Sequence, residues 1–340
     1  MRGNEFFVVP LFIARLKLEI RVKPVIFTKK DLLNMSELWG VILNPKAGNK
    51  KVSRKQTIFD ALHAGGIAGE YRFSEYAGHA SVIARELVAV GFRRFLIVGG
   101  DGTVSEVVDG LMTSGVDSHE FIISILPSGT GNDWCRYWKI PKNINENLEM
   151  ISRQKEQWID VGRLTFFRGD KLVEKYFINS VGLGFDAEIV ARAEKLGRVA
   201  KGLSINYLLG LLGSMAKTKS KHLVMETDDD LFEGKVYTMS IANGPYSGGG
   251  IKQTPNALPT DGMFDILLAD DPNPYEIVRD VSRVLFRQSF GGVLRTYRTS
   301  QVKITTTERH MIEADGIVQA DGESPLTISM VPAAIKMIVC

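Results

Sequence analysis

Apolar and polar positions alternate in two different ways along the chain. Between residues 38 and 141, short apolar runs such as 38–43 and 95–98 precede segments with helical spacing, such as 79–90. Apolar residues of a helix recur three and four positions apart, whereas a buried parallel strand is one short continuous run. Strands and helices that alternate at these lengths are joined by right-handed crossovers. This half therefore predicts a doubly wound parallel α/β domain.

Beyond Trp158 the pattern changes to short strand-like runs with little helix between them. Glycine, proline and aspartate separate the runs, which favours an antiparallel sandwich or barrel. We therefore predict an α/β fold, in which an N-terminal doubly wound domain is followed by a C-terminal antiparallel β-sandwich, with the active site in the cleft between them. The expected divisions are 1–34, 35–157 and 158–340.

Residues 1–34 differ from the rest because they mix apolar and basic residues without leading into a recognisable element. No small-residue cleavage site marks them as a signal peptide. Two interpretations remain. The segment either lies on a membrane surface, or it is sequence upstream of a true start at Met35. The second is favoured because a compact pattern begins at Leu38.

Composition narrows the function classes. The 340 residues hold 42 Lys and Arg against 39 Asp and Glu, a net charge of +3, which argues against a nucleic-acid-binding protein. Cys135 and Cys340 are far apart and form no metal-ligand spacing, so they indicate reduced thiols. No apolar stretch reaches the ~20 residues that span a bilayer.

The sharpest local signal is a glycine-rich turn between a predicted strand and a predicted helix. It reads Gly99, Gly100, Asp101, Gly102 and Thr103. Three glycines allow a backbone to approach a ligand closely, and the N–H groups at such a strand end favour anions. The helix start is marked by a capping-box spacing from the threonine to the glutamate three positions later. The aspartate would repel phosphate unless a cation or a proton transfer accounts for it, which indicates Mg²⁺ or general-base chemistry.

Two further loops follow predicted strands in the same domain. Residues 43–48 combine Pro45, Lys46 and Gly48, which suit a phosphate contact. Residues 127–133 are small or carry hydroxyl groups, and their last positions can cap the next helix. Each loop alone is compatible with an ordinary turn. Three of them at successive strand ends of one parallel sheet converge on one crevice, which predicts a nucleotide phosphate site.

The β-rich half contains two acidic glycine turns. Asp261-Gly262 and Asp321-Gly322 both suit hairpin turns, and Glu323 directly follows the second. Turn chemistry explains the Asp-Gly pairs but not the glutamate. Spacing alone therefore leaves these residues open between a structural and a functional role.

As a set, these motifs resemble the catalytic domain of the bacterial diacylglycerol kinase-type lipid kinases, a family related to sphingosine kinases and, distantly, to NAD kinases. The resemblance runs in order from Trp39 to the C-terminus. The set is highly specific, although residues 99–103 alone also occur in NAD kinases and phosphofructokinases. The matching segments are 44–48, 99–103, 126–133, 179–186, 243–244, 248–250, 255–257, 261–262 and 321–323.

The resemblance implies that ATP and Mg²⁺ are the cofactors. Bacterial relatives hold a structural Mg²⁺ with the aspartate at Asp261 and with the backbone carbonyls at Leu258 and Met263. Glu323 would accept the proton of the lipid hydroxyl and Asp101 would organise Mg²⁺-ATP, although these two roles could be exchanged. The implied ATP contacts are Asn44, Pro45, Lys46, Ala47, Gly48, Ser74, Gly99, Gly100, Asp101, Gly102, Thr103, Ser105 and Thr130. Two of these, Ser74 and Ser105, stand where the family commonly has threonine and asparagine.

The predicted function is transfer of the ATP γ-phosphate to a lipid hydroxyl, most simply that of diacylglycerol, to give phosphatidic acid. The expected partners are a membrane lipid, reached by peripheral contact from the cytoplasmic side, and a second copy in a homodimer, with no nucleic acid. Residues 191–222 surround an apolar stretch with basic residues, so they are either an interfacial element or a helical insertion with a solvated basic face. The rival functions are a soluble NAD kinase-like enzyme and a non-catalytic lipid- or nucleotide-binding regulatory protein.

Overall fold

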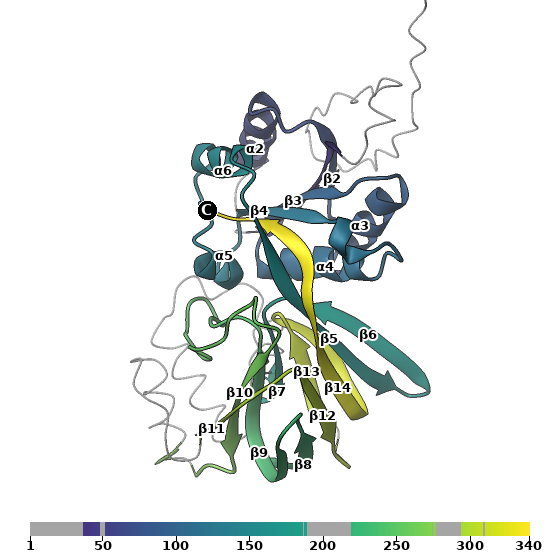
Figure 1. Cartoon of the computed structure of the whole chain (residues 1–340), viewed down its shortest axis with the longest axis vertical. Coiled ribbons are helices and arrows are strands. Elements are labelled where there is room, and N and C mark those ends of the chain that lie inside the picture. Colours follow the sequence, from purple (N-terminus) through teal and green to yellow (C-terminus); the bar gives the residue numbers. More distant parts are fainter. Residues whose placement is uncertain are drawn as a thin grey trace, which may run out of the picture. The chain divides into compact units, whose positions relative to one another are not determined.

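The computed structural model divides the chain into two compact units, Met1–Trp158 with Ile335–Cys340, and Ile159–Ala334 (Figure 1). The structure describes residues 37–47, 52–185, 187–188, 219–273, 275–276, 294–308 and 310–340. Of these, residues 52–56 and 320–323 are described by their backbone alone.

The first unit is built on a parallel sheet in the order β4-β3-β1-β2. Its apolar strands are almost wholly buried because helices cover both faces, as expected for a parallel sheet. The register places Leu43 beside Val98 and Val98 beside Leu126, so three strands end in one row. The strands are β1 (Trp39–Leu43), β2 (Gly69–Phe73), β3 (Arg94–Gly99) and β4 (Ile122–Pro127).

Two helical layers flank this sheet. The chain steps outward from β1 to β2 and then back to β3 and β4, so right-handed crossovers place α2 on one face and both α3 and α4 on the other. Helix α2 packs with α6, and α3 packs with α4. This arrangement confirms the predicted doubly wound fold. The helices are α2 (Val52–Ala64), α3 (His79–Ala89), α4 (Asp101–Met112), α5 (Asp133–Tyr137) and α6 (Ile144–Ser152).

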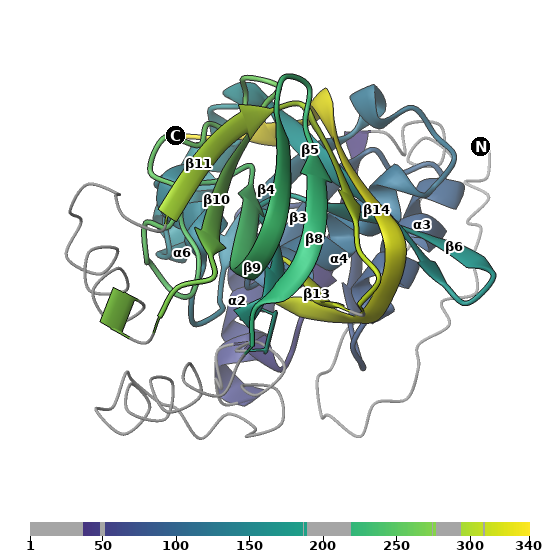
Figure 2. The same cartoon turned by 90° about the horizontal axis from the view of Figure 1, so that it is seen from below.

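The second unit is an antiparallel β-sandwich, as predicted. One run of paired strands is β10-β9-β7-β13-β14, and β8 and β12 complete a closed circuit of pairs between β9 and β14 (Figure 2). Both runs contribute to one apolar core, in which the rings of Phe177 and Phe264 stack with centroids 5.8 Å apart. The strands are β5 (Glu156–Arg168), β6 (Lys171–Phe177), β7 (Ser180–Gly184), β8 (Lys221–Glu226), β9 (Leu231–Ala242), β10 (Phe264–Asp270), β11 (Leu294–Thr299), β12 (Gln301–Thr305), β13 (His310–Ala314) and β14 (Ile317–Ile338).

Strand boundaries differ from the sequence pattern in two places. The apolar run 173–181 is two strands, β6 and β7, because the backbone N–H groups of Ile178 and Asn179 donate to the Asp315 carboxylate instead of to a neighbouring strand. The separate runs 326–330 and 334–339 are joined in one strand, β14, which ends at Ile338.

The end of β14 belongs to the first unit, whereas the sequence pattern assigned all of 158–340 to the β-rich domain. Lys336 and Met337 pair in parallel with Ile122 and Ile123 of β4 and so extend the first sheet by one strand. Trp134 fixes this strand through a hydrogen bond from its indole Nε1 to the Met337 sulfur at 3.4 Å. The first sheet is therefore completed by residues from the far end of the sequence.

Candidate functional site

The three predicted loops begin side by side at the carboxyl edge of the parallel sheet. The N–H of Asn44 donates to the Val98 carbonyl at 2.9 Å, and that of Ser128 donates to the Gly99 carbonyl at 2.8 Å. These bonds continue the β1–β3 and β3–β4 ladders into the loops. The structure thus brings residues 43–47 together with the loops of residues 99–103 and 127–133, as the motif positions predicted.

A cavity opens at this edge of the sheet. It is shallow and open to solvent. Most of its lining is apolar, with a few polar groups, which is the composition of a small-molecule site. The predicted ATP contacts Asn44, Pro45 and Ala47 all line it, and the remaining lining residues are Leu43, Ile58, Phe73, Val98 and Ser128.

Glycine is required where two of the loops meet. A Cβ placed on Gly129 would lie 2.5 Å from the Gly100 Cα, and a Cβ on Gly100 would lie 2.9 Å from the Gly129 Cα. Real Cβ atoms do not approach backbone atoms this closely. A Cβ on Gly99 would likewise lie 2.5 Å from the Thr103 Cβ. The loop glycines therefore let two backbones touch, in addition to any role with a ligand.

Polar side chains link the first loop to the second. Asn44 donates from Nδ2 to the buried Thr103 hydroxyl at 2.9 Å, while its own Oδ1 accepts the N–H of Lys46. The Lys46 ammonium donates to the carbonyl of Glu75 at 2.9 Å. Gly48 lies outside the described residues. The remaining residues of this loop are thus ordered by contacts within the first unit.

Asp101 is an acid with a raised pKa at this edge. It is the first residue of α4, and its Oδ1 accepts the N–H of Trp134 at the start of α5, 3.2 Å away. Burial raises the pKa of the Asp101 carboxyl, and the nearby Asp133 carboxylate raises it further. The cluster of two acids was missed by sequence reasoning, which assigned Asp133 only to helix capping. A divalent cation would relieve the repulsion between the two carboxylates.

The expected capping box of α4 is not formed. Glu106 instead accepts the N–H groups of Gly78 at 2.8 Å and Ala80 at 3.1 Å, at the start of α3. The N-cap of α4 is Gly100, which has no side chain to cap with. The glutamate therefore joins two neighbouring helices, because α3 and α4 pack together and bring its carboxylate to the orphan donors of α3.

The other predicted nucleotide contacts differ in exposure. Thr130 is exposed in the third loop, which leaves its hydroxyl accessible. Ser74 is buried beside the first loop, and its N–H donates to the Leu43 carbonyl at 2.9 Å. Ser105 is buried within α4, so its hydroxyl faces protein rather than solvent. Gly102 is partly exposed within the first turn of α4.

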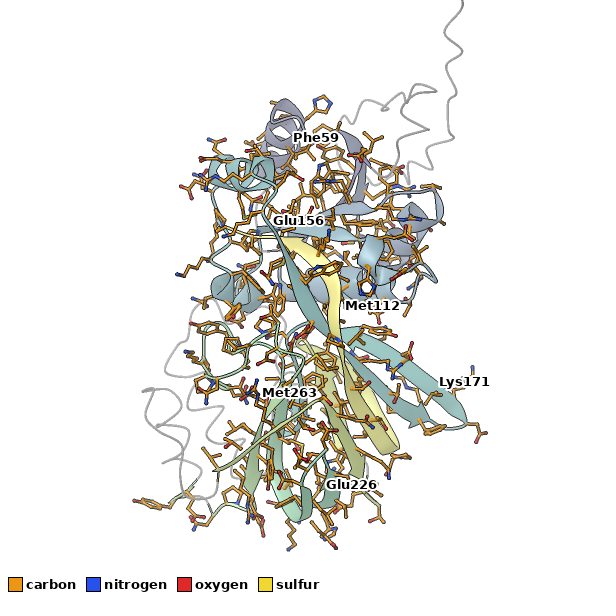
Figure 3. The ribbon with its side chains drawn as sticks, viewed as in Figure 1. Phe59, Met112, Glu156, Lys171, Glu226 and Met263 are labelled. Atoms are coloured by element: carbon orange, nitrogen blue, oxygen red, sulfur yellow. The ribbon has the colours of Figure 1, made fainter. Side chains whose placement is uncertain are left out.

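The predicted metal ligands lie in the second unit, in the loop before β10, near Met263 in Figure 3. Asp261 Oδ1 accepts the N–H of Met263 at 3.1 Å, and Oδ2 is 2.5 Å from the Arg298 guanidinium. The Leu258 carbonyl accepts the N–H of Thr260 at 2.8 Å. Both carboxylate oxygens are thus engaged, so this donor set does not fit a divalent cation as it stands. Among the described residues, no three His, Cys, Asp or Glu side chains converge as metal ligands.

Two buried carboxylates organise the backbone of the second unit, and sequence reasoning missed both roles. Asp160 accepts the N–H groups of Gly262 and Ala333, each at 2.7 Å. Asp315 accepts three N–H groups, from Ile178, Asn179 and Ser180, at 2.8–3.0 Å.

Asn243 connects these two carboxylate sites. Its Nδ2 donates to the carbonyls of Asp160 at 3.0 Å and Ile178 at 2.7 Å. Asn179 donates in turn to the Tyr246 carbonyl at 2.8 Å. Two of the motif asparagines therefore serve as scaffolding in this unit.

Glu323, the predicted proton acceptor, lies in β14, and its side chain is outside the described set. The preceding Gly322 pairs with His310 of β13. His310 is buried, and this burial, with a smaller contribution from the Lys221 charge, lowers its pKa to about 4. The strand that carries Glu323 is thus paired with a neutral histidine at pH 7.

The basic segment expected to contact a membrane falls mostly within residues 189–218, outside the described residues. No helix in the described part of the chain is long and apolar enough to cross a bilayer.

Comparison with known proteins gives two family matches along the chain. Residues 39–164 match the diacylglycerol kinase catalytic domain, and residues 179–339 match the YegS C-terminal NAD kinase beta sandwich-like domain. YtlR of Bacillus subtilis is 28% identical over 316 residues, which cover 88% of this chain and 98% of that protein. The diacylglycerol kinase of Bacillus subtilis is 26% identical over 282 residues, covering 81% and 88%.

Two solved structures share the fold. The crystal structure of a diacylglycerol kinase from Bacillus anthracis superposes with a TM-score of 0.67 at 21% identity, covering 89% of this chain and 97% of that one. Yeast NADH kinase complexed with NADH gives a TM-score of 0.51 at 12% identity, covering 89% and 83%. At these identities the likeness is one of fold.

Proposed function

The chain belongs to the diacylglycerol kinase-type family of lipid kinases, and we propose that it transfers the γ-phosphate of ATP to a hydroxyl group of a membrane lipid. Diacylglycerol, which would give phosphatidic acid, is the first candidate because one relative of 26% identity carries the name diacylglycerol kinase. The hydroxyl oxygen would bond to the γ-phosphorus as the bond to the bridging oxygen breaks, and ADP would leave.

The observation that carries this proposal is the cavity at the carboxyl edge of the first sheet. Residues of the first and third loops line it, and the lining combines apolar side chains with the polar groups of Asn44 and Ser128. The glycine turn of residues 99–103 adjoins this lining, because the Ser128 N–H donates to the Gly99 carbonyl. An apolar wall suits the face of a purine, while loop N–H groups at strand ends suit phosphates. Phosphoryl transfer needs little beyond such positioning and charge neutralisation.

Asp101 and Asp133 are the residues that would hold Mg²⁺ with the nucleotide. Their carboxylates stand close enough for Asp133 to raise the pKa of Asp101. The Arg136 guanidinium lies 3.6 Å from Asp133, too long for a hydrogen bond, so a divalent cation could add counter-charge here. Bound Mg²⁺ would neutralise charge on the phosphates. Glu323 is proposed as the acceptor of the lipid hydroxyl proton, on the strength of the family resemblance at residues 321–323.

Peripheral membrane contact is part of the proposal, and the β5–β6 hairpin is a second candidate for it. Phe167 and Leu172 pair across the hairpin and are 37% and 63% exposed. Arg168 and Lys171 follow and precede them at the tip, where Lys171 points away from the strands (Figure 3). Exposed apolar side chains beside basic ones suit the interface of an anionic bilayer.

The direct test is transfer of labelled γ-phosphate from ATP to a panel of lipids in mixed micelles, with Mg²⁺ or EDTA. We expect magnesium-dependent labelling of one lipid class. Diacylglycerol, phosphatidylglycerol, a sphingoid base and a polyprenol are the acceptors to compare, since each presents a hydroxyl near an interface.

NAD⁺ serves as the soluble acceptor in the same assay, because the fold is shared with yeast NADH kinase. Labelling of NAD⁺ alone would replace the lipid kinase by an NAD kinase-like enzyme. If no acceptor were labelled while Mg²⁺-ATP still bound in calorimetry, a regulatory binding protein would be the better assignment.

A further inference from the structure

Arg298 of β11 stands between two carboxylates of the second unit. Its Nη2 is 2.5 Å from Asp261 Oδ2 in the loop before β10. In the β10–β11 ladder Arg298 is also the direct partner of Asp265, whose Oδ2 is buried and has no hydrogen-bond partner within the described residues. One guanidinium therefore faces two negative charges.

The electrostatics of Asp261 and Asp265 agree with this geometry. Burial raises the pKa of Asp265, the Arg298 charge opposes that rise, and the Asp261 charge adds to it to a lesser extent. The aspartates thus repel each other through space, and the arginine is the cation that compensates them. Guanidinium carries its charge at any physiological pH and offers several donors in a fixed plane.

The loop backbone is fixed independently of this ion pair. The Asp160 N–H donates to the Pro259 carbonyl at 2.9 Å, and the Asp160 carboxylate accepts the Gly262 N–H at 2.7 Å. The Asp261 side chain is therefore presented from an anchored loop, and its partner across the ladder is an arginine.

We propose that Arg298 supplies the positive charge of this loop internally, in the place where bacterial relatives are expected to hold a structural Mg²⁺. Magnesium requires about six oxygen ligands at 2.0–2.1 Å in near-ideal octahedral geometry. Asp261 has both oxygens engaged, and a metal ion bound there would lie against a second cation. The second unit then folds without a metal ion. This inference concerns the second unit alone and does not rest on the proposed function.

The same two strands provide a matched control. Arg295 of β11 pairs with Asp270 of β10 at 2.6 Å, and its side chain is 54% exposed, against 55% for Arg298. Both arginines lie on β11, each pairs with one aspartate and both are about half exposed, although Asp270 lies in β10 and Asp261 in the loop before it. The two arginines differ in that Arg298 also faces Asp265, which its strand register places directly opposite.

The test is the thermal unfolding midpoint of the full chain without nucleotide, in millimolar Mg²⁺ or in EDTA. The wild type, Arg295→Met and Asp261→Asn should respond alike to the metal. Arg298→Met should unfold about 2–4 °C lower in EDTA and recover most of that loss in Mg²⁺, because the freed carboxylates become a cation site. Adding Asp261→Asn to Arg298→Met should abolish the recovery.

A wild type that loses several degrees in EDTA while Asp261→Asn loses none would overturn the proposal, because that difference excludes a cation bound near Asp101. An Arg298→Met variant that Mg²⁺ does not restore would overturn it as well. A second measurement does not depend on whether the Arg298→Met variant folds. Mn²⁺ titration followed by electron paramagnetic resonance should find the same number of bound ions in the wild type and in Asp261→Asn. One fewer ion in Asp261→Asn would show that the wild-type loop binds a metal, contrary to the proposal.

Discussion

The two units place carboxylates in different electrostatic environments. In the second unit, Asp315 accepts three backbone N–H groups and Asp160 accepts two, so each charge is compensated by the backbone it organises. In the first unit, Asp101 is partly buried beside the buried Asp133, and partial burial and the neighbouring charge raise its pKa more than the N–H groups at the start of α5 lower it. The first arrangement stabilises a fold, whereas the second is costly for the fold unless a ligand or cation relieves it. The difference separates scaffold acids from candidate functional acids.

The largest loss of unfolding free energy is expected from Asp315→Ala. Removing this carboxylate leaves three buried N–H groups unsatisfied, which should cost about 3–5 kcal/mol of unfolding free energy. Urea unfolding measures the loss. Asp315→Asn, which retains one acceptor oxygen, should lose clearly less. Equal stability of the alanine variant and the wild type would remove the scaffold role.

Gly129→Ala should break the first unit's site by steric overlap. The added Cβ would meet the Gly100 Cα at 2.5 Å, and separating two backbones of this kind costs about 1–3 kcal/mol. We expect a loss of at least tenfold in ATP affinity by calorimetry. Gly234→Ala is the control, because its Cβ would meet only the tip of the Phe232 ring, at 2.9 Å. Unchanged ATP affinity in Gly129→Ala would show that the loop contact is dispensable.

His310 should make the second unit acid-sensitive. Its pKa is lowered to about 4 in the folded chain, so the folded state disfavours the proton that the unfolded state accepts near pH 6.5. The stability it contributes is therefore present above pH 6.5 and is lost as the pH falls towards 4, by on the order of 2–3 kcal/mol. Urea midpoints of wild type and His310→Gln across this range should converge as the pH falls. A constant difference between them would contradict the assignment.

The smallest effect is expected at the β5–β6 hairpin. Phe167→Ser with Leu172→Ser should weaken sedimentation with anionic vesicles several-fold, because both exposed apolar contacts with the bilayer are lost. The unfolding midpoint should stay close to that of wild type. Leu231→Ser, an exposed leucine on β9, is the control. Vesicle binding that survives the double change would assign membrane contact to another part of the chain.

Local patterns predicted more of the first unit than of the second. Strand–helix alternation and the glycine loops gave the doubly wound domain and the edge of the sheet where the loops meet, because each signal lies within a few residues. The link from Asn44 to Thr103 was not readable, since it joins side chains 59 positions apart. The role of Glu106 was missed for the same reason, because its partners lie on another helix.

The second unit depends on longer-range contacts that leave little sequence signal. Asp160 bonds to residues 102 and 173 positions away, and nothing near it in sequence marks it as an anchor. Arg298 looks like any surface arginine until the β10–β11 register places it beside Asp265 and Asp261. The pairing of the end of β14 with β4 likewise depends on tertiary contacts, which the apolar run 334–339 alone does not specify.

The most direct test of the central claim is a paired measurement on Asp101→Asn. Asparagine keeps an oxygen to accept the Trp134 N–H but removes the charge. Because the folded pKa of Asp101 is raised, its ionised form weakens the fold as the pH rises to neutral, so the variant should be at least as stable as wild type at pH 7. Its magnesium-dependent transfer of labelled γ-phosphate to lipid should fall at least a hundredfold. A variant that is clearly destabilised yet still transfers phosphate at the wild-type rate would make Asp101 a scaffold acid and contradict the proposed site.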